Sequence, residues 1–247
     1  MLLLHTDSLK KYGINRIFEF AQDAGYDGVE VGVIKNNFDT QNAQYLKALS
    51  ETYDIPILAL ETPDISSQKS VEHVIDMAAY LKCPTVVINP PRIFDFRFIS
   101  WLKKGMHEVR RQKKINCALL NASNSSFLGF LPAHAMSSVT DLKEFKMVAL
   151  DTSATASKHI ELIRIYERLK KYIVHIHLSN IRHHKEYSLP NEGILPIESL
   201  LKKLKENDYQ GNVSLLVQPN ELFAGDDDKV IKTLKKVKAF YEEYYKK

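Results

Sequence analysis

Short apolar runs alternate with longer amphipathic stretches along the whole chain. The short runs are nearly continuously apolar, which is typical of strands buried on both faces of a parallel sheet. Eight runs are predicted as strands, at residues 1–5, 28–33, 56–61, 85–90, 116–121, 147–152, 173–179 and 213–218.

The stretches between these runs have the period of a helix. In INRIFEFAQDAG, the residues Ile14, Ile17, Phe18 and Ala21 share one face, and Gly25 then ends the pattern. The segments VEHVIDMAAYLK and IESLLKKLKEN repeat this spacing, and the last segment opens with GDDDK, whose acids suit a helix N-terminus. We interpret these apolar stripes as core packing.

Eight strands that alternate with helices predict a (β/α)8 TIM barrel. No linker or low-complexity segment interrupts the pattern, so residues 1–247 are expected to form a single domain. Two connections are looser, at 121–131 and 180–195. The active site of such a barrel lies at the C-terminal ends of its strands, so we expect both loops at the mouth.

The composition is that of a soluble globular protein, with 45% hydrophobic and 26% charged residues among 247. A chain of this length folds without metals or disulfides, so a bound metal would serve chemistry. The net charge of +4 comes from lysines spread along helical stretches, which can favour anionic ligands but does not indicate nucleic-acid binding.

Two local features of the sequence bear on the cellular compartment of the protein. Cys83 and Cys117 lie next to or inside apolar runs, which predicts buried thiols and no disulfide framework. The opening MLLLHTD holds four apolar residues before a polar one, too few for a signal peptide or a membrane span. We therefore expect a cytoplasmic protein.

Polar residues gather where the predicted strands end. They are His5, Glu30, Glu61, Asn89, Asn121, Asp151, His177, Asn180 and Gln218, and the loops add Arg92, Arg182, His183, His184 and Glu192. Asp151 follows an apolar strand and is the strongest carboxylate candidate, although it could instead cap the next turn. Glu30 and Glu61 could each be a ligand, a base or a partner for a lysine.

The segment HIHLSNIRHH, residues 175–184, holds four of the nine histidines. His175 and His177 are two apart on a strand and face the same side. His177 is nearer the mouth and is expected in the site, whereas His175 is expected to be a buried histidine with a hydrogen-bond partner. His183 and His184 lie in a loop, where at least one should be solvated.

Four segments, GYDGVEVG, ALDTSATA, VHIHLSN and LPNEGILPIESLLKKLKENDYQGNVSLLVQP, resemble the xylose isomerase-like TIM-barrel superfamily. This group includes sugar and sugar-phosphate isomerases and epimerases and the endonuclease IV-type AP endonucleases. The resemblance implies a divalent ion (manganese, magnesium, cobalt or zinc) held by four side chains. They are glutamates ending strands five and eight, an aspartate ending strand six and a histidine in strand seven; the two glutamates typically act as acid and base.

Carried onto this sequence, the aspartate is Asp151 and the histidine is His177, but both glutamate positions hold amides, Asn121 and Gln218. Further departures from the family pattern are Ala154, Asn180 and Ser188. Neutral amide oxygens hold a hard dication much more weakly than carboxylates, and an amide cannot exchange a proton near neutral pH. The resemblance therefore implies a degenerate metal site, with Asp151 and His177 as an incomplete ligand set.

Three functions remain open. The first is a sugar or sugar-phosphate isomerase or epimerase that uses a different base, with Glu30, Glu61, Asp151 and His177 as catalytic candidates. Its substrate-binding candidates are His5, Asn89, Arg92, Asn121, Asn180, Arg182, His183 and Gln218. The second is a non-catalytic sugar- or phosphate-binding or regulatory barrel, in which Arg92 and Arg182 recognise an anionic group.

The third function is an AP endonuclease-like nuclease. The sequence disfavours it, because most metal ligands that this chemistry needs are missing and the chain is only mildly basic. The expected partner is therefore a small carbohydrate or a phosphorylated metabolite, with neither nucleic acid nor a membrane.

Overall fold

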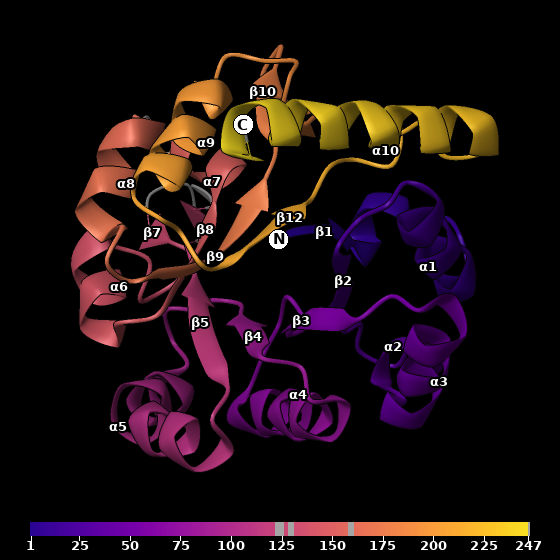
Figure 1. Ribbon diagram of the computed structural model, residues 1–247. Coiled ribbons are helices and arrows are strands. Elements are labelled where there is room, and N and C mark those ends of the chain that lie inside the picture. Colours follow the sequence, from indigo (N-terminus) through magenta and orange to yellow (C-terminus); the bar gives the residue numbers. More distant parts are fainter. Residues whose placement is uncertain (122–125, 128–130, 158–160, 247) are drawn as a thin grey trace.

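A computed structural model of the chain describes residues 1–121, 126–127, 131–157 and 161–246. Eight parallel strands close into a barrel in the order β1-β12-β9-β8-β5-β4-β3-β2 (Figure 1). The strands are β1 (Leu2–His5), β2 (Gly28–Gly32), β3 (Ile57–Glu61), β4 (Thr85–Ile88), β5 (Asn116–Leu120), β8 (Val148–Asp151), β9 (Ile173–Leu178) and β12 (Asn212–Leu215). The predicted TIM barrel is confirmed, and each predicted strand overlaps a barrel strand.

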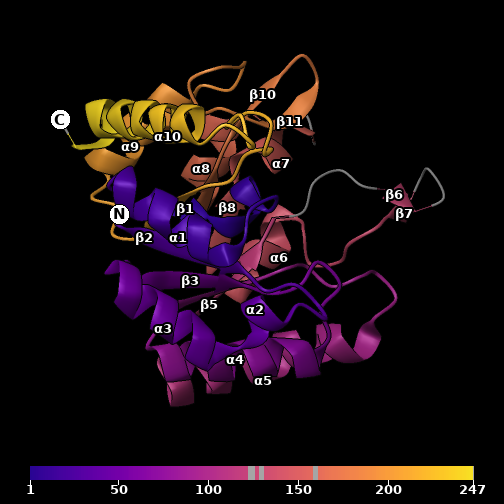
Figure 2. The same ribbon diagram turned by 90° about the vertical axis from the view of Figure 1, so that its right-hand side faces the viewer.

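Helices surround the barrel (Figures 1 and 2). The longer ones are α1 (Ile14–Asp23), α3 (Ala43–Tyr53), α4 (Gln68–Leu81), α5 (Phe96–Lys113), α6 (Val139–Phe145), α8 (Leu162–Leu169), α9 (Ile197–Glu206) and α10 (Asp227–Tyr241). Shorter elements are the 3-10 helix η1 (Thr6–Leu9), α2 (Phe38–Gln41), α7 (Thr152–Ser157) and the π-helical turn η2 (Glu242–Lys246). The apolar stripes of α1, α4, α9 and α10 are buried in the core, as predicted.

Local sequence sets where the last helix begins. The side chain of Asp226 accepts a hydrogen bond from the Lys229 amide and caps α10, and Asp227 and Asp228 occupy its first turn. Carboxylates at this end of a helix are stabilised by the exposed amides and by the helix dipole. The acidic GDDDK segment therefore marks the helix start that its composition predicted.

Two short hairpins lie in the loops expected at the mouth. β10 (Asn180–Arg182) pairs with β11 (Lys185–Ser188), which corrects the expectation of an irregular loop at 180–195. His183 and His184 form its turn with positive φ angles of 50° and 62°. β6 (Ser126–Phe127) pairs with β7 (Leu131–Pro132) inside the other predicted loop, of which residues 122–125 and 128–130 lie outside the described residues. Both hairpins extend on one side of the barrel (Figure 2).

The last barrel strand ends earlier than its apolar pattern predicted. β12 stops at Leu215, although the apolar run continues to Val217 and the predicted strand to residue 218. Beyond it, the Val217 amide donates to Ser8 Oγ at 3.0 Å and the Gln218 amide donates to the Tyr187 carbonyl at 2.8 Å. The backbone thus leaves the barrel ladder because it bonds to η1 and to the hairpin.

The interior of the barrel is divided between apolar and polar side chains. An apolar cluster of Val87, Ala118, Leu120 and Ala149 fills the part next to β4, β5 and β8. Buried polar side chains from β1, β2 and β9 occupy the rest, namely His5, Glu30, His175 and His177. Polar groups buried in this way need hydrogen-bond partners, so this half of the barrel is where chemistry is to be sought.

Both cysteines are buried and unpaired, as their apolar surroundings predicted. Burial raises the pKa of the Cys83 thiol to about 12 and that of Cys117 to about 11, so neither is a reactive thiolate at neutral pH. Within the described part of the chain, no helix combines the length and apolar character needed to cross a membrane.

Candidate functional site

Glu30 lies at the centre of a buried hydrogen-bonded network. Its two oxygens accept from His175 Nε2 at 2.8 Å and from His177 Nε2 at 3.0 Å, and all three side chains are fully buried. Burial opposes a charge on Glu30, but His175, His177 and His5 outweigh it and hold the pKa well below its usual value. Glu30 is therefore a carboxylate shared by two imidazole rings from one strand.

A second carboxylate, Glu61 at the end of β3, is held by two donors. His5 Nε2 lies 2.8 Å from Oε2, and Asn89 Nδ2 donates to Oε1 at 2.9 Å. Burial raises the pKa of Glu61, but the hydrogen bond from His5 and the charge of His177 lower it on balance. Unlike Glu30, Glu61 keeps 12% of its side chain exposed, so it reaches the solvent-facing side of the network.

His5 links the network to the loop that follows β1. The Asp7 amide donates to His5 Nδ1 at 3.1 Å. Nδ1 therefore carries no hydrogen in this arrangement, and the neutral ring is the tautomer with its hydrogen on Nε2. Burial opposes a further charge, but Glu30 and Glu61 outweigh it and raise the pKa of His5 to about 10. The ring can therefore take up a second proton, on Nδ1, at the cost of the Asp7 hydrogen bond.

Glycine at position 32 makes room for this ring. A Cβ atom on Gly32 would lie 2.7 Å from Asp7 Oδ1 and 3.1 Å from His5 Cε1. Real Cβ atoms do not approach other atoms so closely, so any side chain here would displace His5 or Asp7. The glycine that ends β2 therefore belongs to the site through the space it leaves.

A pocket of about 180 Å³ opens at the C-terminal ends of the strands, and we call it the mouth pocket. Its polar lining is Asp7, Lys10, Glu61, Asp64, Asn89, Asp151, Tyr187 and Gln218, and its apolar lining is Leu120, Leu216, Val217 and Pro219. Glu61, Asn89, Asp151 and Gln218 are strand-end candidates from the sequence, and the structure brings these four together. Asp7 and Tyr187 were not anticipated, because both stand on elements that follow a strand.

Asp151 combines the two roles that its position suggested. Its Oδ1 accepts from the Ala154 amide at 3.0 Å and caps α7, while its Oδ2 accepts from the Tyr187 hydroxyl at 3.1 Å in the mouth pocket. Burial raises the pKa of Asp151, with His177 acting in the opposite direction. The charge of Asp151 and burial raise the pKa of Tyr187, so its phenol remains a donor.

Other candidate residues are engaged in holding the fold. Asn121 exchanges two hydrogen bonds with the Asp151 backbone, at 2.6 and 3.1 Å, and so joins the ends of β5 and β8. Asn180 is buried, and its side chain hydrogen-bonds to the backbone of the 180–195 loop. Arg182 is paired with Glu192 and Glu221.

The remaining candidates lie outside the mouth pocket. His183 is exposed at the turn of the hairpin, together with His184. Arg92 is exposed and lines a neighbouring groove, and His177 is one layer below the pocket with Glu30 as its partner. The mouth pocket therefore contains fewer of the predicted binding residues than the strand-end pattern suggested.

The network could hold a cation by its spacing. Ligand atoms of His5, Glu30, Glu61 and His177 all lie within 4.8 Å of one another. Nε2 of each ring faces an ionised carboxylate and so carries a hydrogen in this arrangement, which a bound metal would have to displace. An imidazole that binds a metal normally donates its other N–H, but His5 Nδ1 accepts, and His177 Nδ1 has no partner within the described residues.

The ligand set implied by the family fits a cation no better. Asn121 Oδ1 accepts the Asp151 amide, and both oxygens of Asp151 accept hydrogen bonds from protein groups. Gln218 is exposed at the rim. The two amides offer neutral oxygens, and the oxygens of Asn121 and Asp151 already accept hydrogen bonds from the protein, so this set suits a divalent ion less well than a set with two glutamates.

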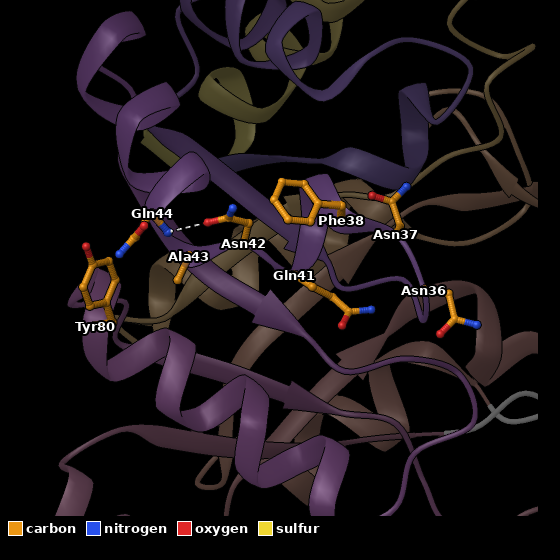
Figure 3. A pocket seen from close by; sticks show the side chains of 8 residues that line it. All are labelled: Asn36, Asn37, Phe38, Gln41, Asn42, Ala43, Gln44 and Tyr80. Carbon is orange, nitrogen blue, oxygen red and sulfur yellow. Dashed lines mark hydrogen bonds between the residues drawn. The ribbon is translucent and has the colours of Figure 1, made fainter.

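A separate hollow of about 620 Å³ lies on the outside of the barrel, at α2, α3 and α4 (Figure 3). Five of the eight lining side chains are amides; with them lie Phe38, Ala43 and Tyr80. Several of these amides cap helices, as Asn42 does when it accepts from the Gln44 amide at 3.1 Å (Figure 3). Among its described lining residues there is no carboxylate or imidazole, in contrast to the mouth pocket.

Residues 18–235 match the family model described as a xylose isomerase-like TIM barrel. An uncharacterized protein of Mycobacterium leprae (strain TN) is 24% identical over an alignment of 252 positions, gaps included, and the alignment covers 89% of each chain. D-allulose 3-epimerase from Methylomonas sp., solved with D-allulose, has a TM-score of 0.73 at 14% identity, covering 99% of this chain and 96% of that one. The probable 3-DHS dehydratase of Bacillus anthracis has a TM-score of 0.69 at 14% identity, covering 97% and 99%. At such identities the solved structures establish the fold alone.

Proposed function

The chain belongs to the xylose isomerase-like TIM-barrel family, and we propose that it moves a proton on a carbohydrate, as an isomerase or epimerase of sugars. The family supplies the barrel and the place of the site, and its solved members include an epimerase that binds D-allulose. The reaction itself must be argued from this chain's own side chains.

One observation carries the proposal: Glu61 is an ionised carboxylate that lines the mouth pocket while His5 and Asn89 hold both of its oxygens. A general base must reach the substrate, be unprotonated and keep a fixed orientation, and Glu61 meets these three conditions. Glu30 fails the first condition because it is fully buried under the rings of His175 and His177.

The proposed reaction begins when a sugar displaces water from Glu61. This loss of solvation raises the basicity of the carboxylate, which then takes the proton from the carbon beside the sugar carbonyl. The electron pair of the broken C–H bond moves into an enediolate, whose oxygen can be stabilised by Lys10 and Gln218 of the pocket. Return of the proton to the former carbonyl carbon, with transfer of the hydroxyl proton between the two oxygens, gives isomerisation. Delivery of a proton from water to the opposite face of the original carbon gives epimerisation, and Glu61 then passes its proton to solvent.

We further propose that this reaction does not use a divalent ion. The oxygens of Asn121 and Asp151 in the family's ligand set are engaged with the protein, and the Nε2 atoms of His5 and His177 carry hydrogens toward Glu61 and Glu30. Stabilisation of the enediolate then rests on hydrogen bonds and on the Lys10 ammonium. This account differs from family chemistry in the source of positive charge at the site.

The test is solvent exchange in deuterium oxide, followed by proton NMR on a panel of neutral aldoses and ketoses. Chelator-treated protein should catalyse the incorporation of deuterium at the carbon next to the carbonyl of at least one sugar. Added manganese, zinc, cobalt or magnesium should change the rate by less than about twofold, whereas Glu61→Gln should lower it by about 10²- to 10⁴-fold. Glu51→Gln, an exposed change on α3, should leave the rate unaltered. Exchange that requires added metal would contradict the proposal.

A second function is favoured by the amides at two strand ends. Asn121 and Gln218 cannot transfer a proton, and Gln218 lines the mouth pocket where it can hydrogen-bond a sugar, which suits a non-catalytic sugar-binding barrel. Saturable binding of a panel sugar, with no exchange under any metal condition, would favour this alternative.

A further inference from the structure

A groove of about 870 Å³ lies beside the mouth pocket, and we call it the side groove. Its walls come from the loops after β3 and β4 and from the segment after β7. Asp64 lines both the side groove and the mouth pocket, so the two spaces adjoin at this residue. The side groove therefore lies on the face of the barrel where substrates bind.

The mouth pocket alone is small for a ligand site. Its volume of about 180 Å³ is below the range of about 300 to 1,000 Å³ that is usual for small-molecule sites. A ligand that contacts Glu61 and is larger than the mouth pocket must continue into adjoining space. The side groove is that space, because it begins at Asp64.

The walls of the side groove are mostly apolar. Five of its lining residues are Ile65, Pro90, Ile93, Phe94 and Ala133. Ile65 is 62% exposed and Phe94 is 59% exposed, and both line the same groove. Covering them would remove apolar surface from water, which favours an apolar group as the occupant.

Hydrogen bonds between the two loops hold the groove in shape. The Ile93 amide donates to the Ala133 carbonyl at 3.3 Å, and the Ala135 amide donates to the Pro91 carbonyl at 2.8 Å. His134 Nδ1 lies 3.2 Å from the Pro90 carbonyl, which makes this nitrogen the donor. The walls are therefore joined before any ligand arrives, as expected of a binding site.

The charges around both spaces disfavour an anionic ligand. Among the described lining residues, the mouth pocket carries four acids (Asp7, Glu61, Asp64 and Asp151) and one basic side chain, Lys10. The side groove adds Asp95 and is balanced by Arg92, with His134 beside it. A phosphate would enter an excess of negative charge, whereas a neutral sugar would find hydrogen-bond acceptors.

We infer that the substrate is an uncharged sugar derivative that keeps a carbonyl group, with its sugar part in the mouth pocket and an apolar substituent, such as an aryl group, in the side groove. Phenyl glycosides lack a free carbonyl, so they probe the binding arrangement alone. The inference rests on the proposed function, because it places the reacting carbons at Glu61. It narrows the substrate class from sugars and sugar phosphates to uncharged sugars that carry an apolar group.

The test compares ligands that differ in one group. Phenyl β-D-glucopyranoside and phenyl β-D-galactopyranoside are titrated calorimetrically beside their methyl counterparts and beside glucose 6-phosphate. At least one phenyl glycoside should bind about tenfold or more tightly than its methyl counterpart, because its ring covers apolar wall. Glucose 6-phosphate should bind more weakly than either.

Variants locate the effect in the side groove. Ile65→Ala combined with Phe94→Ala should reduce the preference for phenyl over methyl to about twofold, because the wall is removed. Phe38→Ala is the matched control, since Phe38 is an exposed phenylalanine (73%) in the separate hollow of Figure 3. Equal affinity for phenyl and methyl glycosides, tighter binding of the phosphate, or a preference that survives the double substitution would overturn the inference.

Failure of this inference can be told apart from failure of the proposed function. Binding is measured in the Glu61→Gln protein as well, since affinity does not require proton transfer. A phenyl preference without solvent exchange in the wild-type protein would support the side groove and contradict the catalytic proposal. Solvent exchange on free sugars without a preference for phenyl glycosides would support the catalytic proposal and contradict the role of the side groove.

Discussion

At the scale of single residues, the site consists of imidazole and carboxylate side chains joined by hydrogen bonds. Glu30 lies 145 residues before His175 in the chain, yet their side chains are 2.8 Å apart. The single polar residue of GVEVG, Glu30, and the alternation of histidines in HIHL each predict an inward-facing side chain. Their pairing could not be predicted, because it depends on which strands face each other across the closed barrel.

A pH prediction belongs to His5. Its folded pKa of about 10 is above the unfolded value of 6.5, so its contribution to stability is complete below pH 6.5 and is lost as the pH rises through about 10. The free energy of unfolding of the wild-type protein should therefore exceed that of a His5→Gln variant most at about pH 6 and least at about pH 10. Urea unfolding at both values measures the difference.

His183→Gln serves as the control for this comparison, because His183 is exposed at the hairpin turn. Glu30 behaves in the opposite sense: its lowered pKa gives stability that is present above its unfolded value of 4.5 and lost as the pH falls through the folded value. A difference between wild type and His5→Gln that stays constant from about pH 6 to about pH 10 would contradict the assigned environment.

At the scale of elements, the hairpin β10–β11 brings Tyr187 to the mouth pocket and depends on Asn180. The Oδ1 of Asn180 accepts from the amides of Ile181 and Leu195, both at 2.8 Å, and Nδ2 donates to the Pro190 carbonyl at 2.9 Å. An aspartate, which the family pattern has here, would supply no donor for that carbonyl. The asparagine thus suits the loop of this chain.

Asn180→Asp should therefore destabilise the protein by about 2–4 kcal/mol, because a buried carboxylate would face carbonyl oxygens and leave one of them unpaired. Guanidinium or urea unfolding at neutral pH measures this change. Asn207→Asp is the matched control, because Asn207 is exposed at the end of α9 and its change should stay within about 0.5 kcal/mol. Equal stability of the two variants would show that the Asn180 hydrogen bonds do not hold the loop.

The hairpin also shows what a sequence pattern leaves out. Its strands have three and four residues, too few for alternation to separate them from a loop. The two turn residues with positive φ are histidines, where glycine or asparagine would have signalled the turn. Tyr187 was missed for the same reason, since its place in the pocket follows from the pairing of β10 with β11.

At the scale of the whole molecule, the apolar runs predicted all eight barrel strands, because strands buried on both faces leave a continuous signal. Knowledge of the fold then placed Glu61, Asn89, Asp151 and Gln218 at one end, and these four line the mouth pocket. The hydrogen bonds of Asn121 and Asn180 to the backbone could not be inferred, because an amide at a strand end suits a ligand as well as a neighbouring peptide group.

The central claim is that this barrel performs acid–base chemistry with shared protons in place of a divalent ion. Elemental mass spectrometry tests it directly on protein incubated with manganese, zinc, cobalt or magnesium and then freed of unbound ions. Well under one ion per chain is expected in every case, because the Nε2 atoms of His5 and His177 and the Asn121 side chain are engaged within the protein. One tightly held ion per chain, lost in a Glu61→Gln or His177→Gln variant, would contradict it.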